Sequence, residues 1–363
     1  MILSKINYYQ YTIPYKTPLY INKIKSKRRE GIIIEICDTQ KNSGVGEIAP
    51  LPGLHLETIE AITGRLHVID NHIDRNTLPE QLDALQSTME ELFEKMHLYP
   101  SVEFAVSMAL LDLSAKRLRI PLYKLFKKTC NAQVPVNGLL KGSPGEVLAQ
   151  ARELIAAGYT TLKLKVGLWP VDYDIELVKQ LTQITGDNIK LRLDANRKWT
   201  MPIALKFAQN IADCRLEYIE EPVNEPGEFK SFHEQTGLPV AIDESLPFFT
   251  AGNKNLPDWI AALILKPSLL GSIFKTIHYI GLAKKQNIKP VITSVYETSL
   301  SLKMLAQIAA AFLPAGTAVG LDTIKLLAGD TLQEPFSAGD GFTDVTVASM
   351  QNFALKELYC LKM

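Results

Sequence analysis

Short apolar segments alternate with longer segments of helical periodicity from residue 134 onward. The eight apolar segments are residues 134–140, 161–166, 189–195, 216–222, 239–245, 262–267, 289–294 and 318–323. This alternation predicts βα units around a parallel sheet, and eight of them predict a closed (β/α) barrel of the TIM type. An open doubly wound sheet is the alternative, but no Gly-x-Gly-x-x-Gly follows an early strand.

The chain before residue 126 has a different pattern. Strand-like segments at 2–13, 29–38 and 44–51 come first, and helix-like segments at 58–73, 79–96 and 101–118 follow. Strands followed by helices predict a separate α+β domain. We therefore expect an α+β domain over residues 1–125 and a barrel domain over residues 126–323. The tail, residues 324–363, is expected to pack on the first domain, with its GDGFTD stretch as a turn.

The charge balance argues against nucleic acid or an anionic membrane as a partner. Lys and Arg number 39 and Asp and Glu number 39, so the formal net charge is zero. No apolar stretch reaches the roughly 18 residues of a membrane span, and we expect a cytoplasmic protein with a small-molecule partner. The four cysteines and six histidines have no metal-ligand spacing, so zinc is not expected. Whether the chain forms a homo-oligomer stays open.

Two lysines interrupt the segment 161–166. Lys163 and Lys165 are two residues apart, so both side chains lie on the same face of a strand. If that face points into the barrel, burial and mutual repulsion favour the neutral amine and lower the pKa of at least one lysine. One of them is then a candidate base. The alternative is a half-exposed strand whose lysines face solvent.

Three acidic residues lie at the ends of consecutive predicted strands. They are Asp194, Glu220 and Asp243, separated by 26 and 23 residues, or one βα unit each time. Consecutive strands therefore place the three carboxylates side by side at the C-terminal rim, where barrel active sites lie. Oxygen ligands without His or Cys suit a hard cation, so we expect Mg²⁺, with Mn²⁺ as a substitute. The alternative is that these acids cap helices or form salt bridges.

Lys266 ends the next predicted strand, 23 residues after Asp243. In an eight-stranded barrel the second and sixth strands are opposite, so Lys266 faces Lys165 across the mouth. A cation between two amines suits removal of a proton α to a carboxylate. The second negative charge that develops there needs stabilisation.

These residues resemble the enolase superfamily, in particular its muconate-lactonising subgroup. The matching motifs are Lys-x-Lys at 163–165, Asp-Ala-Asn at 194–196, Glu-Glu-Pro at 220–222, Asp-Glu-Ser at 243–245 and Lys-Pro at 266–267. This superfamily is a known example of a Lys or His base that works with Mg²⁺. The resemblance implies that the first domain caps the barrel and closes over the substrate with a mobile loop, expected around Lys25 to Arg29. It also implies that Asp194, Glu220 and Asp243 bind the metal, that Lys165 is the acid/base and that Lys163 supports it.

Further segments narrow the resemblance within this subgroup. Residues 44–54, 100–110, 191–199 and 320–323 resemble its dehydrating enzymes of menaquinone biosynthesis. The implied reaction is the syn dehydration of 2-succinyl-6-hydroxy-2,4-cyclohexadiene-1-carboxylate by a carbon–oxygen lyase. Racemisation of N-succinylamino acids or epimerisation of dipeptides on the same machinery is the alternative, and a non-catalytic metal-binding scaffold is a remote one.

Four residues are expected to bind the substrate. Ser294, Thr298 and Ser299 follow the seventh predicted strand, and their hydroxyls could donate hydrogen bonds to a succinyl carboxylate. Gly320, on the eighth strand, stands where the subgroup's dipeptide epimerases usually carry an acid, which leaves room for an anionic group. A simple turn requirement is the alternative for this glycine.

Overall fold

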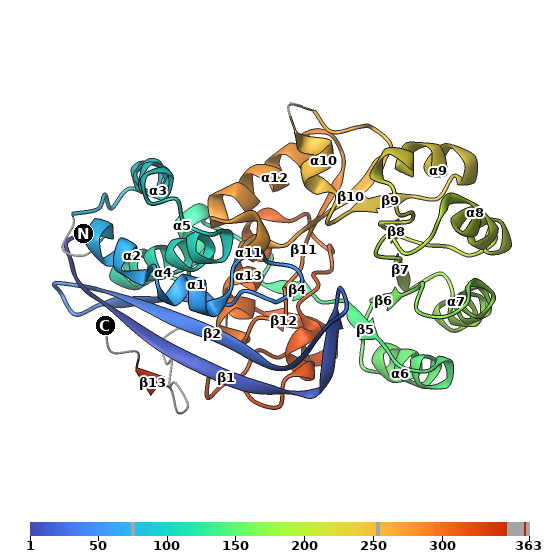
Figure 1. The fold of residues 1–363 in the computed structure, drawn as a ribbon, viewed down its shortest axis with the longest axis horizontal. Coiled ribbons are helices and arrows are strands. Elements are labelled where there is room, and N and C mark those ends of the chain that lie inside the picture. Colours follow the sequence, from blue (N-terminus) through green and yellow to red (C-terminus); the bar gives the residue numbers. More distant parts are fainter. Residues whose placement is uncertain (74–76, 252–254, 347–358, 361–363) are drawn as a thin grey trace.

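The computed structural model describes residues 1–73, 77–251, 255–346 and 359–360. A long antiparallel sheet with helices on one side forms one part of the molecule, and a parallel barrel surrounded by helices forms the other (Figure 1). No helix within the described residues is long and apolar enough to cross a bilayer. We propose the domain boundaries at residues 125/126 and 323/324; the short helix α5 (Tyr123–Phe126) lies at the first of them.

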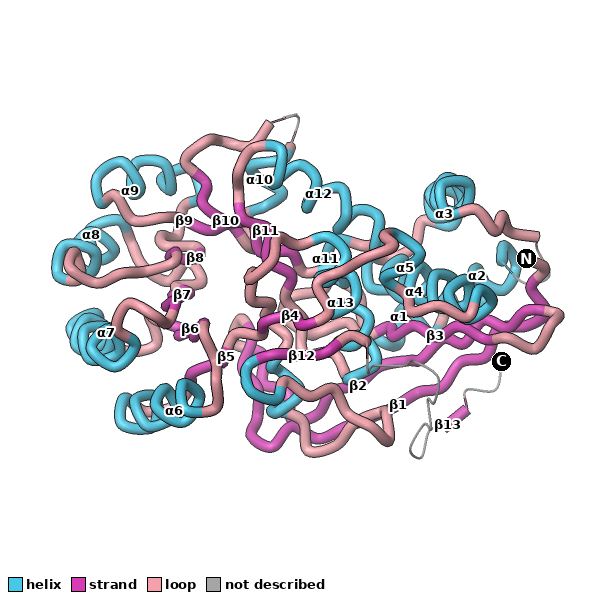
Figure 2. The backbone as a smooth tube through the Cα atoms, turned by 180° about the vertical axis from the view of Figure 1, so that it is seen from behind, coloured by secondary structure: helices cyan, strands magenta, loops and turns pink. Residues whose placement is uncertain are grey.

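The antiparallel sheet, which we call the capping sheet, has the strand order β13-β1-β2-β3. Its strands are β1 (Leu3–Ile21), β2 (Ile24–Asp38), β3 (Ser43–Ile48) and β13 (Tyr359–Cys360). β1 and β2 form a long hairpin that extends toward the barrel (Figures 1 and 2). The backbone of β13 pairs with β1, so the C-terminal tail returns to this sheet.

Helix α4 (Pro100–Leu118) lies on the capping sheet and is buried along most of its length. Two glycines of β3 permit the close approach. A Cβ on Gly44 would lie 2.0 Å from the Ala109 carbonyl oxygen, and one on Gly46 would lie 1.9 Å from that of Ala105. The remaining helices before α5 are α1 (Ile59–Thr63), α2 (Leu66–Ile73) and α3 (Leu82–Met96). The Gly-Val-Gly sequence is therefore a packing requirement.

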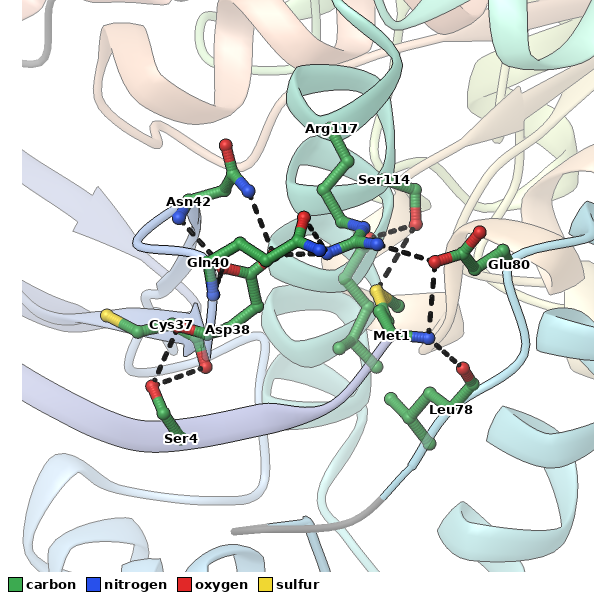
Figure 3. A network of polar contacts seen from close by, with 11 residues as sticks. Met1, Ser4, Cys37, Asp38, Gln40, Asn42, Leu78, Glu80, Ser114 and Arg117 are labelled. Carbon is green, nitrogen blue, oxygen red and sulfur yellow. Dashed lines mark hydrogen bonds and ion pairs between the residues drawn. The ribbon is translucent and has the colours of Figure 1, made fainter.

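A polar network ties the start of the chain to α4 (Figure 3). The Arg117 guanidinium contacts the Asp38 and Glu80 carboxylates, each at 2.5 Å. The Met1 amino group donates to the Leu78 carbonyl oxygen at 2.5 Å. Burial disfavours the Asp38 carboxylate, but hydrogen bonds from Asn42 and Arg117 outweigh burial and lower its pKa. The edge of the first domain is thus fixed by ionic contacts as well as by its apolar core.

Within the described residues, the barrel has seven hydrogen-bonded parallel strands in chain order. They are β5 (Gly138–Leu140), β6 (Thr161–Lys165), β7 (Lys190–Asp194), β8 (Tyr218–Glu220), β9 (Val240–Ile242), β10 (Ile260–Leu265) and β11 (Lys289–Ile292). Isolated bridges close the ring, because Val319 pairs with Val136 and Gly320 pairs with Thr293. The predicted barrel class is confirmed, with its eighth strand reduced to these bridges.

Helices surround the strands on the outside of the barrel (Figure 2). They are α6 (Pro144–Ala156), α7 (Val171–Thr185), α8 (Met201–Asn210), α9 (Phe229–Thr236), α10 (Leu246–Thr250), α11 (Pro267–Leu270), α12 (Ile273–Lys285) and α13 (Ser299–Phe312). Ser143 begins α6 with a capping box whose second member is Glu146.

Two local predictions were wrong. Residues 134–140 form two strands, because β4 (Gln133–Pro135) pairs antiparallel with β12 (Phe342–Asp344) before β5 begins. The GDGFTD stretch is a turn only in its first half, Gly339–Gly341, and its second half is β12. The polar sequence of β12 hid this strand, which is stabilised by pairing with a distant segment rather than by an alternating pattern.

Candidate active site

Five charged residues lie at the C-terminal ends of five consecutive barrel strands, which we call the mouth. Lys165 pairs in register with Asp194, and Asp194 with Glu220, so these three residues lie at one level. Asp243 and Lys266 directly follow β9 and β10. All three carboxylate residues are buried, Glu220 completely. The geometry therefore brings together the groups that the sequence places at the strand ends.

Lys163 lies inside this set, one alternation deeper on β6. Its Nζ is 2.7 Å from Glu220 Oε2 and 3.0 Å from Asp194 Oδ2. Burial disfavours the ammonium, but the two carboxylates outweigh burial and raise the pKa of Lys163 well above its ordinary value. The sequence predicted a lowered pKa for at least one of Lys163 and Lys165. Lys163 is not that lysine, because its nearest charges are negative.

Lys266 approaches the set from the other side. Its Nζ contacts Asp243 Oδ2 and lies 3.5 Å from Glu244 Oε1. Burial opposes the charge, but Asp243 and Glu244 raise the pKa of Lys266. Lys165 also acts electrostatically on this set, because its positive charge helps to lower the pKa of Asp194 against the effect of burial. Ammonium groups thus reach the carboxylates from opposite sides.

The three carboxylates of Asp194, Glu220 and Asp243 are oxygen ligands of the kind that a hard cation prefers. Glu220 Oε1 is buried and has no hydrogen-bond partner among the residues that the structure describes. Burial, together with the charges of Asp194 and Asp243, raises the pKa of Glu220. A carboxylate in this position would be stabilised by a nearby cation. Among the described residues, however, no group of three or more His, Cys, Asp or Glu already has the spacing of a metal site. The lysine ammonium groups instead lie against the carboxylates.

Glu221 organises the backbone around Asp243. Its Oε1 accepts hydrogen bonds from the backbone N–H groups of Asp243 at 2.8 Å and Ser245 at 3.1 Å, and its Oε2 accepts one from the Ser245 hydroxyl at 2.6 Å. Burial raises the pKa of Glu221 to about 7. Glu221 itself has a left-handed backbone, with φ of 50°. Glu221 directly follows Glu220, and its contacts fix the backbone from Asp243 to Ser245.

The four predicted substrate-binding residues have differing surroundings. Ser294 Oγ lies 2.7 Å from Thr323 Oγ1 and donates to the Gly320 carbonyl oxygen at 3.2 Å. Thr298 and Ser299 begin α13 and are fully buried; their hydroxyls contact Thr331 and Asp330, respectively. These contacts occupy the hydroxyls, and the substrate-binding role of all four residues stays a prediction.

Gly320 is needed for a close approach within the barrel wall. A Cβ at this position would lie 2.7 Å from Thr293 Cγ2 and 3.0 Å from Thr293 Cβ. Both residues belong to the bridge that closes the barrel. Close packing against Thr293 therefore explains why a glycine stands at position 320, an explanation that the turn hypothesis did not include.

Two buried charges of the first domain fasten it to the segment that follows β11; we call these contacts the latch. Glu47 accepts hydrogen bonds from the backbone N–H of Thr298 at 3.0 Å, from the Ser301 hydroxyl at 2.6 Å and from the Tyr11 hydroxyl at 2.5 Å. Arg29 is 1% exposed, and its Nε donates to the Tyr296 carbonyl oxygen at 2.9 Å. A carboxylate at the start of α13 is also favoured by the helix dipole.

The expected mobile loop around Lys25 to Arg29 lies within strand β2 instead of in a loop. The turn of the hairpin is at Asn22 and Lys23, both with left-handed backbones. Arg29 was expected to move with this loop, but its guanidinium is buried in the latch. The loop was expected from the family resemblance alone, and here the same residues continue the hairpin as a strand.

His55 makes a further contact between the two domains. Its Nδ1 accepts a hydrogen bond from the backbone N–H of Leu51 at 2.9 Å, so its Nε2 carries the proton and donates to the Ser268 carbonyl oxygen at 3.2 Å. Burial lowers the pKa of His55 to about 4, with a contribution from Arg29 that Glu57 partly offsets. The neutral imidazole therefore joins the loop after β3 to α11.

A capped barrel with lysines and acids at its mouth defines a class of enzyme, and the comparisons with known proteins agree with it. Residues 146–348 match the family model described as Enolase C-terminal domain-like, and residues 3–113 match the model of the MenC N-terminal domain. The chain belongs to the enolase superfamily. An o-succinylbenzoate synthase of Pasteurella multocida (strain Pm70) is 32% identical over 335 residues, which cover 90% of this chain and 91% of that protein. Within the superfamily, the chain belongs to the o-succinylbenzoate synthase family.

Solved structures share this fold. The L-Ala-D/L-Glu epimerase from Bacillus subtilis aligns with a TM-score of 0.82 at 22% identity, covering 95% of this chain and 96% of that chain. A dipeptide epimerase from Enterococcus faecalis V583, complexed with Mg and the dipeptide L-Leu-L-Tyr, aligns with a TM-score of 0.79 at 24% identity, covering 94% and 100%. At these identities the likeness supports the architecture, and the capped barrel fold is confirmed.

Proposed function

We propose that the protein is an o-succinylbenzoate synthase, a carbon–oxygen lyase. It converts 2-succinyl-6-hydroxy-2,4-cyclohexadiene-1-carboxylate to o-succinylbenzoate by syn dehydration, a step of menaquinone biosynthesis. The observation that carries the proposal is the arrangement of Lys165, Asp194, Glu220, Asp243 and Lys266 at the ends of consecutive strands. The relatives that cover nearly the whole chain support the same assignment.

Lys165 is the proposed acid/base. Its amine takes the proton α to the ring carboxylate, and the resulting ammonium then returns a proton to the hydroxyl group that leaves from the same face as water. Lys266 stabilises the negative charge that develops on the carboxylate, since its ammonium is buried and already oriented. Lys163, held between Asp194 and Glu220, supports the arrangement of the acids. No redox change occurs in this elimination.

Asp194, Glu220 and Asp243 are the proposed ligands of Mg²⁺, or of Mn²⁺ as a substitute. When bound, the ion would supply positive charge for the carboxylate of the substrate. The unpartnered Glu220 Oε1 supports this assignment. We also propose a cytoplasmic location, which the free thiols of Cys37, Cys130 and Cys214 support.

A spectrophotometric assay of the diene-to-arene conversion tests the function. The purified protein should convert the substrate with Mg²⁺, and EDTA should stop the reaction reversibly. Lys165→Ala should abolish turnover while calorimetry still detects Mg²⁺ binding; retained turnover would refute the role of Lys165. Incubation of N-succinylamino acids and dipeptides in D₂O tests the alternative, since α-deuterium exchange with inversion would indicate racemisation or epimerisation.

A further inference from the structure

Tyr296 has an unusual backbone in the segment between β11 and α13. Its φ is 59°, in the left-handed region that bulky residues rarely adopt. Such a conformation costs on the order of 1 to 3 kcal/mol and persists where the surroundings impose it, often at functional sites. The surrounding structure must therefore fix Tyr296 in place.

Arg29 supplies that constraint from the capping sheet. Its Nε donates to the Tyr296 carbonyl oxygen at 2.9 Å, and its Nη2 lies 3.3 Å from the Val295 carbonyl oxygen. The other guanidinium contacts go to the carbonyl oxygens of Ala49, of Pro50 at 2.7 Å and of Glu30 at 3.5 Å. Because these backbone carbonyls engage all its nitrogens, Arg29 acts on the segment around Tyr296 and has no donor group left unengaged for a ligand.

The phenol of Tyr296 lies between the capping sheet and the mouth. Its ring packs against the buried cluster that includes Tyr11, Ile13 and Leu300. Burial raises the pKa of Tyr296, while the charges of Lys266 and Lys163 act in the opposite direction, so the phenol lies within electrostatic reach of both lysines. The side chain is partly exposed. No hydrogen bond to its hydroxyl is formed among the described residues.

A second phenol lies beside the same segment. Tyr15 of β1 is 6% exposed, and its buried hydroxyl has no hydrogen-bond partner in the described part of the chain. Burial raises the pKa of Tyr15 to about 12, with electrostatic contributions from Arg29 and Tyr296. Thr298 and Ser299, by contrast, have their hydroxyls engaged by Thr331 and Asp330. Among the described residues around this segment, the phenols of Tyr15 and Tyr296 therefore have hydroxyls without a hydrogen-bond partner. The aliphatic hydroxyls that were expected to bind the substrate are engaged.

We propose that Tyr296 is a specificity-determining residue that donates a hydrogen bond to the succinyl carboxylate of the substrate, and that Arg29 is its positioning residue. This inference rests on the proposed function. The ring carboxylate belongs between Lys165 and Lys266, and Tyr296 lies on the capping side of those lysines, where the remote end of the substrate would extend. A neutral phenol suits this task because it adds a donor without another charge.

Calorimetry with Mg²⁺ present tests the inference without turnover. The ligands are o-succinylbenzoate and 2-butyrylbenzoate, which lacks the terminal carboxylate. Tyr296→Phe removes only the hydroxyl and should weaken o-succinylbenzoate about 10- to 100-fold, as for a hydrogen bond to a charged group, while 2-butyrylbenzoate binding stays unchanged. Tyr279→Phe, on the outer helix α12, is the matched control and should change neither.

Arg29→Lys separates positioning from a structural role. A lysine keeps the charge but cannot reach carbonyls of both domains, so it should weaken o-succinylbenzoate selectively, and Tyr296→Phe should add little further loss in that background. Equal weakening of both ligands by Arg29→Lys would mean that Arg29 has only a structural role. Unchanged binding, or equal weakening of both ligands, in Tyr296→Phe would overturn the inference as a whole. If the wild-type protein binds no o-succinylbenzoate, the proposed function fails instead.

Discussion

Acid should weaken the contact between the two domains through His55. The folded protein holds the pKa of His55 at about 4, against an ordinary value of 6.5, because burial disfavours the imidazolium. The unfolded chain therefore binds a proton more readily, and stability rises with pH across this interval. The contribution of the neutral His55 to the free energy of unfolding is complete above pH about 6.5 and is lost as the pH falls to about 4. The shift corresponds to about 3 kcal/mol in total, at about 1.4 kcal/mol per pH unit.

Urea unfolding at pH 7 and pH 5 measures this effect. Integration over that interval gives a loss of about 2 kcal/mol in the free energy of unfolding from His55 alone. His55→Asn should therefore lose about 2 kcal/mol less than the wild-type protein between the two pH values. His233→Asn is the control, since His233 lies on helix α9, where its ring contacts the Leu238 carbonyl oxygen and Trp259. It should follow the wild type. If His55→Asn and the wild type lose the same free energy, the imidazole does not control the acid sensitivity of the interface.

Three further substitutions test the latch, the barrel closure and the backbone around Asp243. Glu47→Ala leaves buried donors at Thr298 and Ser301 without an acceptor and should lower the free energy of unfolding by about 3 to 5 kcal/mol in urea, against about 1 kcal/mol for Tyr11→Phe. Gly320→Ala should cost about 1 to 3 kcal/mol by overpacking against Thr293 Cγ2, and Thr293→Ser should restore part of it; additive losses would contradict the contact. Glu221→Ala should reduce Mg²⁺ affinity roughly 10- to 100-fold by calorimetry, whereas Glu225→Ala should leave it unchanged.

The sequence was informative where a residue type conflicts with its expected environment. The lysines and acids lie at the ends of apolar strands, and barrel topology places those ends on one rim. The sequence therefore predicts that these side chains lie close together. The alternation of strand and helix segments likewise predicts the barrel, and the strands followed by helices before residue 126 predict the α+β domain. A regular period of βα units is a strong signal because each strand must be covered by a helix.

Contacts between distant segments could not be predicted in this way. Arg192 extends across the barrel interior to Asn137 and the Ala318 carbonyl oxygen, and it pairs with Glu217 at 2.6 Å, although such positions are usually aliphatic. Its partners come from strands that only the folded barrel brings together. Tyr296 was missed for a related reason: a lone aromatic residue in the TSVYETS segment is a visible signal, but its left-handed backbone depends on Arg29, far away in the sequence.

The latch contacts the barrel mainly through main-chain atoms. Arg29 bonds to carbonyl oxygens, and Glu47 accepts from backbone N–H groups, with the Ser301 hydroxyl as its one side-chain partner in the described part of the barrel. Any amino acid offers the same carbonyl oxygen, so the side chain of Tyr296 can change during evolution while Arg29 keeps its contact with the main chain. The docking of the two domains and the preference for a substrate can therefore change independently of one another. This independence marks Tyr296, whose side chain is partly exposed, as a position where a designer could exchange the side chain and keep the contact with Arg29.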